Sequence, residues 1–228
     1  KWVSTALMWS PIKALEQSFT RTKNSNFEEF NKMMDIRTNS SNNTVYADAD
    51  GNIAYYHGNF IPKRDIQFDY TKPVDGSNPK TDWNGLHALE DNIFVMNPEN
   101  GWIQNCNSTP FTSAGKNSPK KEDYPYYMSS FPENFRGIHA IPLLNKATDL
   151  TLDKLITLAY DSYLPGADQL ITSLIKAYDA NKNDTQDLKE AIDLLKNWDF
   201  KVSKSSIAMT LSQYYLNTYY RSGNIPKS

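Results

Sequence analysis

The sequence predicts an α+β layered domain, because a strand-rich middle zone lies between two helical zones. Apolar residues recur near a 3.6-residue spacing towards both ends of the chain. The middle instead carries short runs of β-branched and aromatic residues, bounded by Gly, Pro, Asn and Asp. We expect a helical pair in residues 1–43, hairpins and a long loop in 44–112, and mainly helices in 113–228, within a single fragment 1–228.

The composition is that of a folded globular chain. Of the 228 residues, 39% are hydrophobic and 22% are charged, which is the usual balance. The net charge of −2 gives no electrostatic signal for nucleic acid or an anionic membrane. No run approaches the ~18 apolar residues of a spanning helix, and the mean hydropathy is −0.64. A single cysteine, Cys106, excludes an intramolecular disulfide and a Cys-rich zinc site.

The chain opens on Lys1-Trp2-Val3-Ser4, without an initiator Met and without the apolar segment of a signal peptide. It then runs directly into a helical pattern. We therefore expect it to be a piece of a longer protein.

Two helices are predicted near the start. Residues 4–23 carry apolar side chains at helical spacing, and Pro11 is tolerable only near a helix start or at a kink. Ser25-Asn26-Phe27-Glu28 reads as a capping box that opens a second helix, which continues to Ile36. The Asn/Ser-rich residues 39–43 end it as a polar loop.

The first predicted hairpin pairs residues 44–48 with 53–57 around the turn Ala49-Asp50-Gly51-Asn52. Its Asp and Asn side chains also suggest a calcium loop. However, Gly51 falls at the fourth position rather than the sixth, and no Glu closes the loop. A plain turn is therefore the better interpretation.

A second hairpin is predicted from residues 93–96 and 102–107, joined by the turn Asn97-Pro98-Glu99-Asn100-Gly101. Between the two hairpins lies a long Pro/Gly/Asp-rich stretch, residues 62–86. Loops of that length inside compact domains are usually functional surfaces.

The last third reads as helical after a Lys/Ser/Pro-rich loop at 113–124. Asp184-Thr185-Gln186-Asp187 resembles a helix N-cap. Four helices are expected, beginning near Leu152, running around Leu170–Ile175, spanning Leu188–Leu195, and covering Ser205–Tyr220.

Generic motifs supply no complete catalytic set. His57, His87 and His139 are far apart, and no metal-binding pair accompanies them. The residues on either side of Cys106 match no thiol-protease signature. We therefore interpret Cys106 as a small, buried hydrophobic residue at the end of a strand. Nucleophile-elbow, phosphate-loop and dinucleotide-binding patterns are missing from the sequence.

The middle zone carries a series of more specific motifs. They are Tyr46-Ala47-Asp48 with Gly51-Asn52-Ile53, His57-Gly58, Pro62-Lys63-Arg64, Pro73-Val74-Asp75-Gly76, Trp83-Asn84-Gly85, Asn97-Pro98 and Asn105-Cys106-Asn107. The order and spacing of these motifs strongly resemble the second chain of the penicillin acylase family. The members of that family are N-terminal-nucleophile amide hydrolases and include penicillin, cephalosporin and acyl-homoserine-lactone acylases. Segments 9–34, 131–144 and 197–208 extend the resemblance to nearly the whole chain.

The resemblance implies part of an αββα sandwich and hydrolysis of a linear N-acyl amide bond in a small molecule. It implies a nucleophilic Ser at the start of the second chain, whose free amine acts as the base. Ser4 is neither terminal nor in the matching context. We therefore expect this fragment to be inactive alone. Its partners would be the first (alpha) chain and the N-terminal part of the second chain.

The resemblance assigns two catalytic residues. Asn107, the second Asn of the NxN motif, matches the family residue whose side chain donates a hydrogen bond to the oxyanion. Without the family context it would read as a turn-forming residue ahead of Pro110. Arg136 matches an Arg near the active site that orients the nucleophile's surroundings, and its alternative is a surface Arg.

Further residues follow from the same resemblance. Asp69 matches a buried loop Asp with a structural hydrogen-bonding role. Some members bind calcium through this loop and a second Asp, but Pro125 stands near that position, so we expect no cofactor, and a metal site is left unassigned. Trp102 and Phe111, with the Tyr pair at 126–127, are candidates for an acyl pocket, although aromatics at such spacings are usually core residues.

Two other functions remain open at this stage. The first alternative is a family member that has lost its nucleophile and serves as a binding module. The second is an unrelated extracytoplasmic protein- or glycan-binding domain. Aromatic, Asn-rich loops would suit the latter. The resemblance implies a periplasmic or extracellular location.

Overall fold

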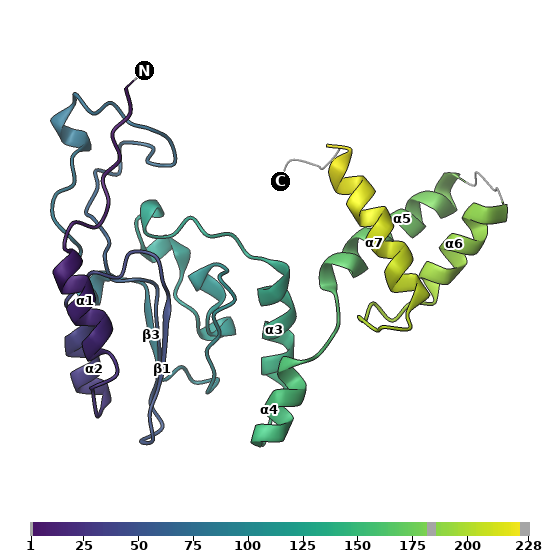
Figure 1. Cartoon of the computed structure of the whole chain (residues 1–228), viewed down its shortest axis with the longest axis horizontal. Coiled ribbons are helices and arrows are strands. Elements are labelled where there is room, and N and C mark those ends of the chain that lie inside the picture. Colours follow the sequence, from purple (N-terminus) through teal and green to yellow (C-terminus); the bar gives the residue numbers. More distant parts are fainter. Residues whose placement is uncertain (1, 182–185, 224–228) are drawn as a thin grey trace. The chain divides into compact units, whose positions relative to one another are not determined.

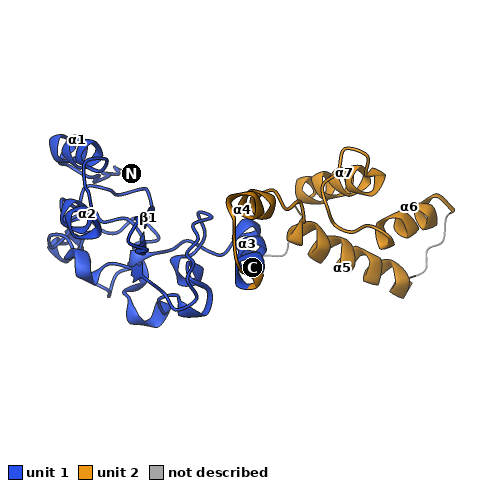
Figure 2. Cartoon of the chain, turned by 90° about the horizontal axis from the view of Figure 1, so that it is seen from below, with its two compact units in different colours: residues 1–145 blue, residues 146–228 orange. Residues whose placement is uncertain are grey.

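The computed structural model describes residues 2–181 and 186–223. The chain divides into two compact units, Lys1–Asn145 and Lys146–Ser228, which Figure 2 colours separately. Helices and a three-stranded antiparallel sheet together confirm the α+β class. Each unit is described by itself below.

The first unit begins with two helices, α1 (Pro11–Thr20) and α2 (Phe27–Met34). The predicted start of α1 near residue 4 is wrong, since residues 2–10 have no regular structure and Pro11 takes the first helical position. Proline is favoured there because the N–H that it lacks has no partner within the helix.

The cap of α2 lies one residue later than predicted. The side chain of Asn26 accepts a hydrogen bond of 2.9 Å from the N–H of Glu29. In return, the Glu29 carboxylate accepts one of 2.8 Å from the N–H of Ser25. The reciprocal capping arrangement is present, but it uses Asn26 and Glu29 rather than Ser25 and Glu28.

The sheet has the order β1 (Thr44–Ala47), β2 (Ile53–Tyr56) and β3 (Phe94–Met96), with both pairs antiparallel. The first hairpin is confirmed, with Thr44 opposite Tyr56 and Ala47 opposite Ile53.

The second predicted hairpin is wrong. Residues 102–107 form no strand, and β3 pairs with β2 instead. The side chain of Asn97 accepts a hydrogen bond of 2.8 Å from the N–H of Ile53, which ties the end of β3 to β2. The segment after the turn bonds elsewhere, as the N–H of Gln104 donates to the carbonyl of Ser113 at 2.7 Å.

The two faces of the sheet carry separate hydrophobic clusters, because successive strand residues point in opposite directions. Helix α2 covers one face, and Figure 1 shows α1 and α2 on the same side of the strands. The other face packs against the segment that follows β3. The first cluster joins Phe30, Met33, Met34, Ala54, Tyr56 and Leu89, and the second joins Tyr55, Val95 and Ala114.

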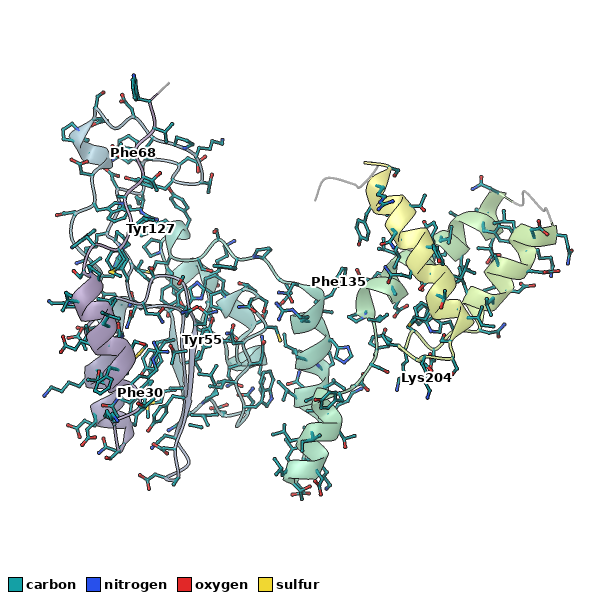
Figure 3. The ribbon with its side chains drawn as sticks, viewed as in Figure 1. Phe30, Tyr55, Phe68, Tyr127, Phe135 and Lys204 are labelled. Carbon is teal, nitrogen blue, oxygen red and sulfur yellow. The ribbon has the colours of Figure 1, made fainter. Side chains whose placement is uncertain are left out.

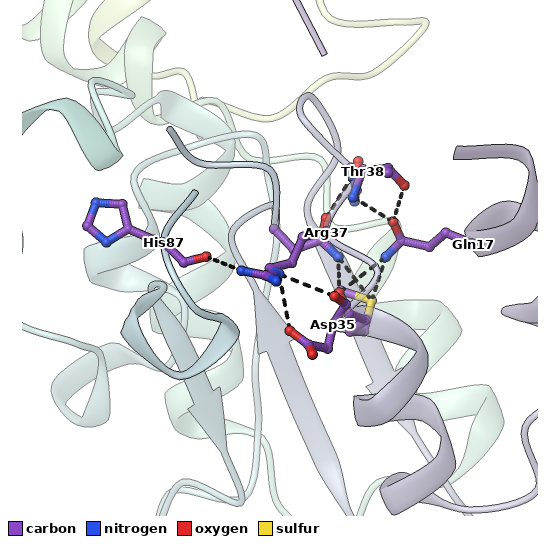
Figure 4. A network of polar contacts seen from close by, with 8 residues as sticks. Gln17, Asp35, Arg37, Thr38 and His87 are labelled. Carbon is purple, nitrogen blue, oxygen red and sulfur yellow. Dashed lines mark hydrogen bonds and ion pairs between the residues drawn. The ribbon is translucent and has the colours of Figure 1, made fainter. Parts of the chain in front are cut away.

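A buried polar network attaches α1 to the connection between α2 and β1 (Figure 4). Gln17 is 2% exposed, and its Oε1 accepts hydrogen bonds from the N–H and hydroxyl of Thr38 at 3.0 and 2.5 Å. Arg37 has a left-handed backbone (φ 56°) and donates to the carbonyl of His87 at 3.1 Å. These contacts stabilise an irregular turn that hydrophobic packing alone would leave undefined.

The unit ends with α3 (Phe135–Lys146), a helix that contains Pro142 and was not predicted from the sequence. The second unit consists of α4 (Leu152–Ala159), α5 (Pro165–Asn181), α6 (Gln186–Lys196) and α7 (Ile207–Arg221).

The second unit contains the four helices expected in the last third of the chain. Helices α5, α6 and α7 pack around a cluster that includes Ile171, Leu195 and Trp198. Most of the cap predicted at 184–187 lies outside the described residues. No helix in the described ranges has the length and apolarity to cross a membrane.

Buried His57 follows directly after β2. It is 7% exposed, its Nδ1 lies 3.1 Å from the hydroxyl of Tyr55, and its ring meets Phe131 edge-to-face at 5.8 Å. Burial lowers the pKa of His57 to about 4, so the imidazole is neutral at physiological pH.

Replacing Gln17 by alanine should lower the free energy of unfolding by about 2–4 kcal/mol, because it leaves the buried N–H and hydroxyl of Thr38 without an acceptor. The exposed neighbour Glu16 provides a matched control, since Glu16→Ala alters the same helix without touching the network. Urea denaturation measures both variants. Equal midpoints for the two would contradict this role of Gln17.

The stability of the protein should depend on pH through His57. Its pKa is lower in the folded chain than in the unfolded chain, so the unfolded state binds more protons between pH 6.5 and about 4. Stability is therefore lost as the pH falls through this window, by about 3 kcal/mol at most. Urea unfolding at pH 7 and pH 4.5 should show a smaller loss for His57→Gln than for the natural chain. If both proteins lost the same free energy of unfolding, His57 would not be the group responsible.

Candidate active site

Asn107 lies in an exposed bend between β3 and α3. Its backbone is left-handed (φ 51°), a conformation that Asn tolerates better than most residues. Its N–H donates to Oδ1 of Asn105 at 3.2 Å, and the same oxygen accepts a hydrogen bond of 3.0 Å from Asn43, just ahead of β1. The bend is therefore attached to the sheet through side-chain amides.

Arg136, in the first turn of α3, contacts the side chain of Asn107. Its Nη2 donates to Oδ1 of Asn107 at 3.3 Å. Because a guanidinium group only donates, the oxygen of the carboxamide must face Arg136, and the orientation of Asn107 follows from that. In the described chain, the Nδ2 group of Asn107 has no acceptor, so its N–H bonds are available to a ligand.

One side chain that sequence reasoning missed, Asn134, joins the bend to the helix. Its Nδ2 donates to the carbonyls of Cys106 and Asn107 at 3.0 and 3.2 Å. Its Oδ1 accepts from the backbone N–H groups of Arg136 and Gly137 at 3.0 and 3.1 Å, as a helix cap does. An Asn two residues ahead of the Arg was the available signal, because Asn is a favoured cap.

Glu133 holds the other side of the bend. Its carboxylate accepts hydrogen bonds from the hydroxyl of Thr112 at 2.6 Å and from the N–H of Asn134 at 2.9 Å. A Cβ atom at Gly137 would lie 2.2 Å from Oε1 of Glu133 and 3.0 Å from Oγ of Ser108. A larger residue at 137 would therefore have to displace the Glu133 carboxylate.

Cys106 is half-buried and lies in the bend rather than at a strand end. Burial raises the pKa of its thiol, the charge of Glu133 adds to this, and Arg136 opposes it. The protonated thiol is a poor nucleophile at neutral pH. The geometry thus gives no support to thiol catalysis.

The first unit contains a cavity of about 380 Å³. Loop 40–43, the chain after β2 and residues 127–131 line it, so Asn43 belongs both to its wall and to the Asn107 network. Figure 3 labels Tyr127, which lines the cavity, and Phe135 at the start of α3. Two hydrogen bonds through Oδ1 of Asn105 therefore link Asn43, on the cavity wall, to the backbone N–H of Asn107.

The structure places the other predicted site residues elsewhere. Trp102 packs over Gly115, where a Cβ would lie 3.0 Å from its ring. Phe111 packs against the cluster of Ile61, Ile93 and Met128. Neither lines the cavity described above, so their assignment to an acyl pocket stays a prediction.

The expectation that Asp69 is buried is wrong. Its side chain is 53% exposed and pairs with Lys72 at 3.3 Å. Its Oδ1 accepts hydrogen bonds from the hydroxyl and the N–H of Thr71 at 2.5 and 3.0 Å, and these bonds hold the pKa of the carboxyl below its usual value. The residue stabilises a local turn, which needs no burial.

Acidic and other metal-ligating side chains do not gather in one place in the part of the chain that the structure describes. Within residues 2–181 and 186–223, no three His, Cys, Asp or Glu side chains cluster. Pro125, near the position of the second calcium ligand, offers no carboxylate.

Known proteins share both sequence and fold with this chain. The family described as "Penicillin amidase" matches residues 1–223. Penicillin G acylase from Escherichia coli is 44% identical over 68 residues, which are 30% of this chain and 8% of that protein. A solved structure of a thermostable penicillin G acylase from Alcaligenes faecalis superposes with a TM-score of 0.68 at 18% identity, covering 92% of this chain and 37% of that chain. The superposition confirms the expected N-terminal-nucleophile hydrolase fold, and the family match confirms the resemblance: the chain belongs to the penicillin amidase family.

Proposed function

We propose that this chain is the oxyanion-binding part of an enzyme that hydrolyses the N-acyl amide bond of a small molecule. One observation supports it most: Arg136 orients the carboxamide of Asn107 so that the N–H bonds are left for a ligand. Family membership supports the reaction class, since penicillin amidases are amide hydrolases. An oriented neutral donor of this kind is what an amide-hydrolysis transition state requires.

In the proposed reaction, a Ser hydroxyl attacks the amide carbonyl and negative charge develops on the carbonyl oxygen. The Nδ2 group of Asn107 donates to that oxygen. The amine leaves with a proton, and water then releases the acid from the acyl-serine. Arg136 polarises the carboxamide from its oxygen side, which makes the N–H bonds of Asn107 stronger donors.

The proposal includes segments outside this chain. The chain covers 37% of the matched penicillin G acylase chain. The nucleophilic Ser is assigned by family resemblance to the start of the second chain, and the substrate would meet the first chain as well. Residues 1–228 alone are accordingly proposed to be inactive. An exported location, periplasmic or extracellular, belongs to the same proposal, and family membership is what supports it.

Asn107→Ala in the full-length enzyme should lower kcat by ~10²–10³, a barrier increase of about 3 kcal/mol, with little change in KM. Hydrolysis of a chromogenic phenylacetyl or fatty-acyl amide measures it. Asn181→Ala on α5 is a matched control that leaves the bend intact. Adding Arg136→Ala to Asn107→Ala should cost little more, because the two act as one unit. Additive losses, or full activity of Asn107→Ala, would refute the assignment.

Gly137→Ala should lower both kcat and the free energy of unfolding, the latter by about 1–3 kcal/mol. The new methyl group meets the Glu133 carboxylate, which has to move and so gives up its hydrogen bonds to Thr112 and Asn134. Gly76→Ala is the control, since nothing lies within 4 Å of a Cβ there. Thermal unfolding and the same amide assay compare the two variants. If they behave alike, close packing at Gly137 does not position Asn107.

A further inference from the structure

The sequence contains two Asn-Gly pairs, Asn84-Gly85 and Asn100-Gly101. In such a pair the backbone nitrogen of the glycine can attack the side-chain carbonyl of the asparagine, because glycine has no side chain to obstruct the approach. The attack closes a five-membered ring and releases the side-chain nitrogen. By sequence alone the two asparagines are equally reactive, and their surroundings in the structure separate them.

Asn100 is restrained at both reacting groups. The N–H of Gly101 donates to the carbonyl of Pro98 at 2.8 Å, so the attacking nitrogen is already engaged in a turn. The half-buried side chain of Asn100 donates from Nδ2 to the carbonyl of Ala114 at 3.0 Å, and its Oδ1 is buried. Ring closure at Asn100 therefore requires two hydrogen bonds to break.

Asn84 lacks both restraints. It is exposed, as is Gly85, and within residues 2–181 and 186–223 neither its carboxamide nor the N–H of Gly85 has a hydrogen-bond partner. Gly85 has a left-handed backbone (φ 76°), and apart from its chain neighbours no atom of the described chain lies within 4 Å of the position that a Cβ would take there. The carboxamide can therefore rotate onto the free nitrogen, and water has access to the product.

The main chain at Asn84 is fixed, in contrast to its side chain. The N–H of Asn84 donates to the carbonyl of Lys63 at 3.0 Å, and the N–H of Lys63 donates to the carbonyl of Gly85 at 3.0 Å. Next to them, Pro62 and Leu86 form an antiparallel bridge. These contacts join the two ends of the long Pro/Gly/Asp-rich loop 62–86.

We propose that Asn84 is a site of spontaneous deamidation and that its product loosens the closure of loop 62–86. Base removes the proton of the Gly85 nitrogen, which then forms a bond to Cγ of Asn84. The bond from Cγ to Nδ2 breaks, and Nδ2 takes up a proton and leaves as ammonia. Water then opens the succinimide ring at either of its two carbonyls, which yields aspartate or isoaspartate at residue 84.

Isoaspartate continues the chain through its former side chain, so the backbone between residues 84 and 85 gains one carbon atom. The two hydrogen bonds with Lys63 span this linkage, one at residue 84 and the other at Gly85. The extra carbon changes the spacing of these two partners, while the spacing at Lys63 stays the same. At least one of the two bonds is therefore lost, and the loop opens more often at this end.

Peptide mass spectrometry of the full-length protein after incubation at pH 8 measures the modification. Deamidation raises the mass of the peptide, and electron-transfer fragmentation identifies isoaspartate. Asn84 should react ~10- to 100-fold faster than Asn100, because Asn100 must first give up two hydrogen bonds. Asn100 is the matched control, since its dipeptide is the same. Equal rates, a faster rate at Asn100 or an unmodified Asn84 overturns the proposal.

Denaturation in urea separates the effect of the structure from that of the dipeptide. In the unfolded chain both glycine nitrogens are free, so the two rates should approach each other. A ratio that stays unchanged in urea would mean that the hydrogen bonds at Asn100 are not the cause, and it would overturn the structural argument.

Limited trypsin digestion tests the consequence for loop 62–86. Natural protein aged until residue 84 is converted should be cut in this loop about fivefold faster than Asn84→Gln aged in the same way, which is the effect of one lost hydrogen bond on the open population. Asn84→Asp supplies the added charge without the extra backbone carbon, and it should be cut at the rate of fresh natural protein. Equal cutting of the aged natural protein and aged Asn84→Gln would overturn the effect on the loop.

Discussion

The side chain of Asn134 connects the two parts on which the candidate site depends. A helix start exposes N–H groups that need acceptors, and an irregular bend exposes carbonyls that need donors. A carboxamide offers both, and Asn134 uses its oxygen for α3 and its nitrogen for Cys106 and Asn107. The position of Arg136 relative to Asn107 follows, because both are fixed to the same side chain within hydrogen-bond distance.

The cavity wall depends on a similar use of amides. The carboxamide of Asn59, which is fully buried, accepts from the N–H of Asn39 at 2.7 Å and donates to the carbonyl of Met34 at 2.6 Å. Together with the Gln17 network, this fixes the loop between α2 and β1 without regular secondary structure. Polar networks that are satisfied in this way specify one conformation where packing alone would allow several.

The sequence could predict what local chemistry decides. The first hairpin follows from a turn signal between two alternating runs, and the C-terminal helices follow from their apolar spacing. Which strand β3 joins is a tertiary choice, and for this reason the second hairpin was wrong. Asn107 and Arg136 are 29 residues apart in the sequence, and no local pattern predicts their contact. Only the family resemblance identified both as site residues. Asp69 shows the limit of that resemblance, since a matching residue type does not guarantee a matching environment.

At position 107, the side chain that would bind Arg136 most strongly is not the one that the proposed reaction needs. An aspartate at 107 would give the guanidinium a full negative charge in place of an amide oxygen, and a charge-assisted pair is the stronger bond. The same change would remove the N–H donor and put repulsion where an oxyanion forms. Selection for a more stable fold at this bend therefore works against the proposed reaction, and the weaker neutral partner is the one that leaves a donor for a substrate.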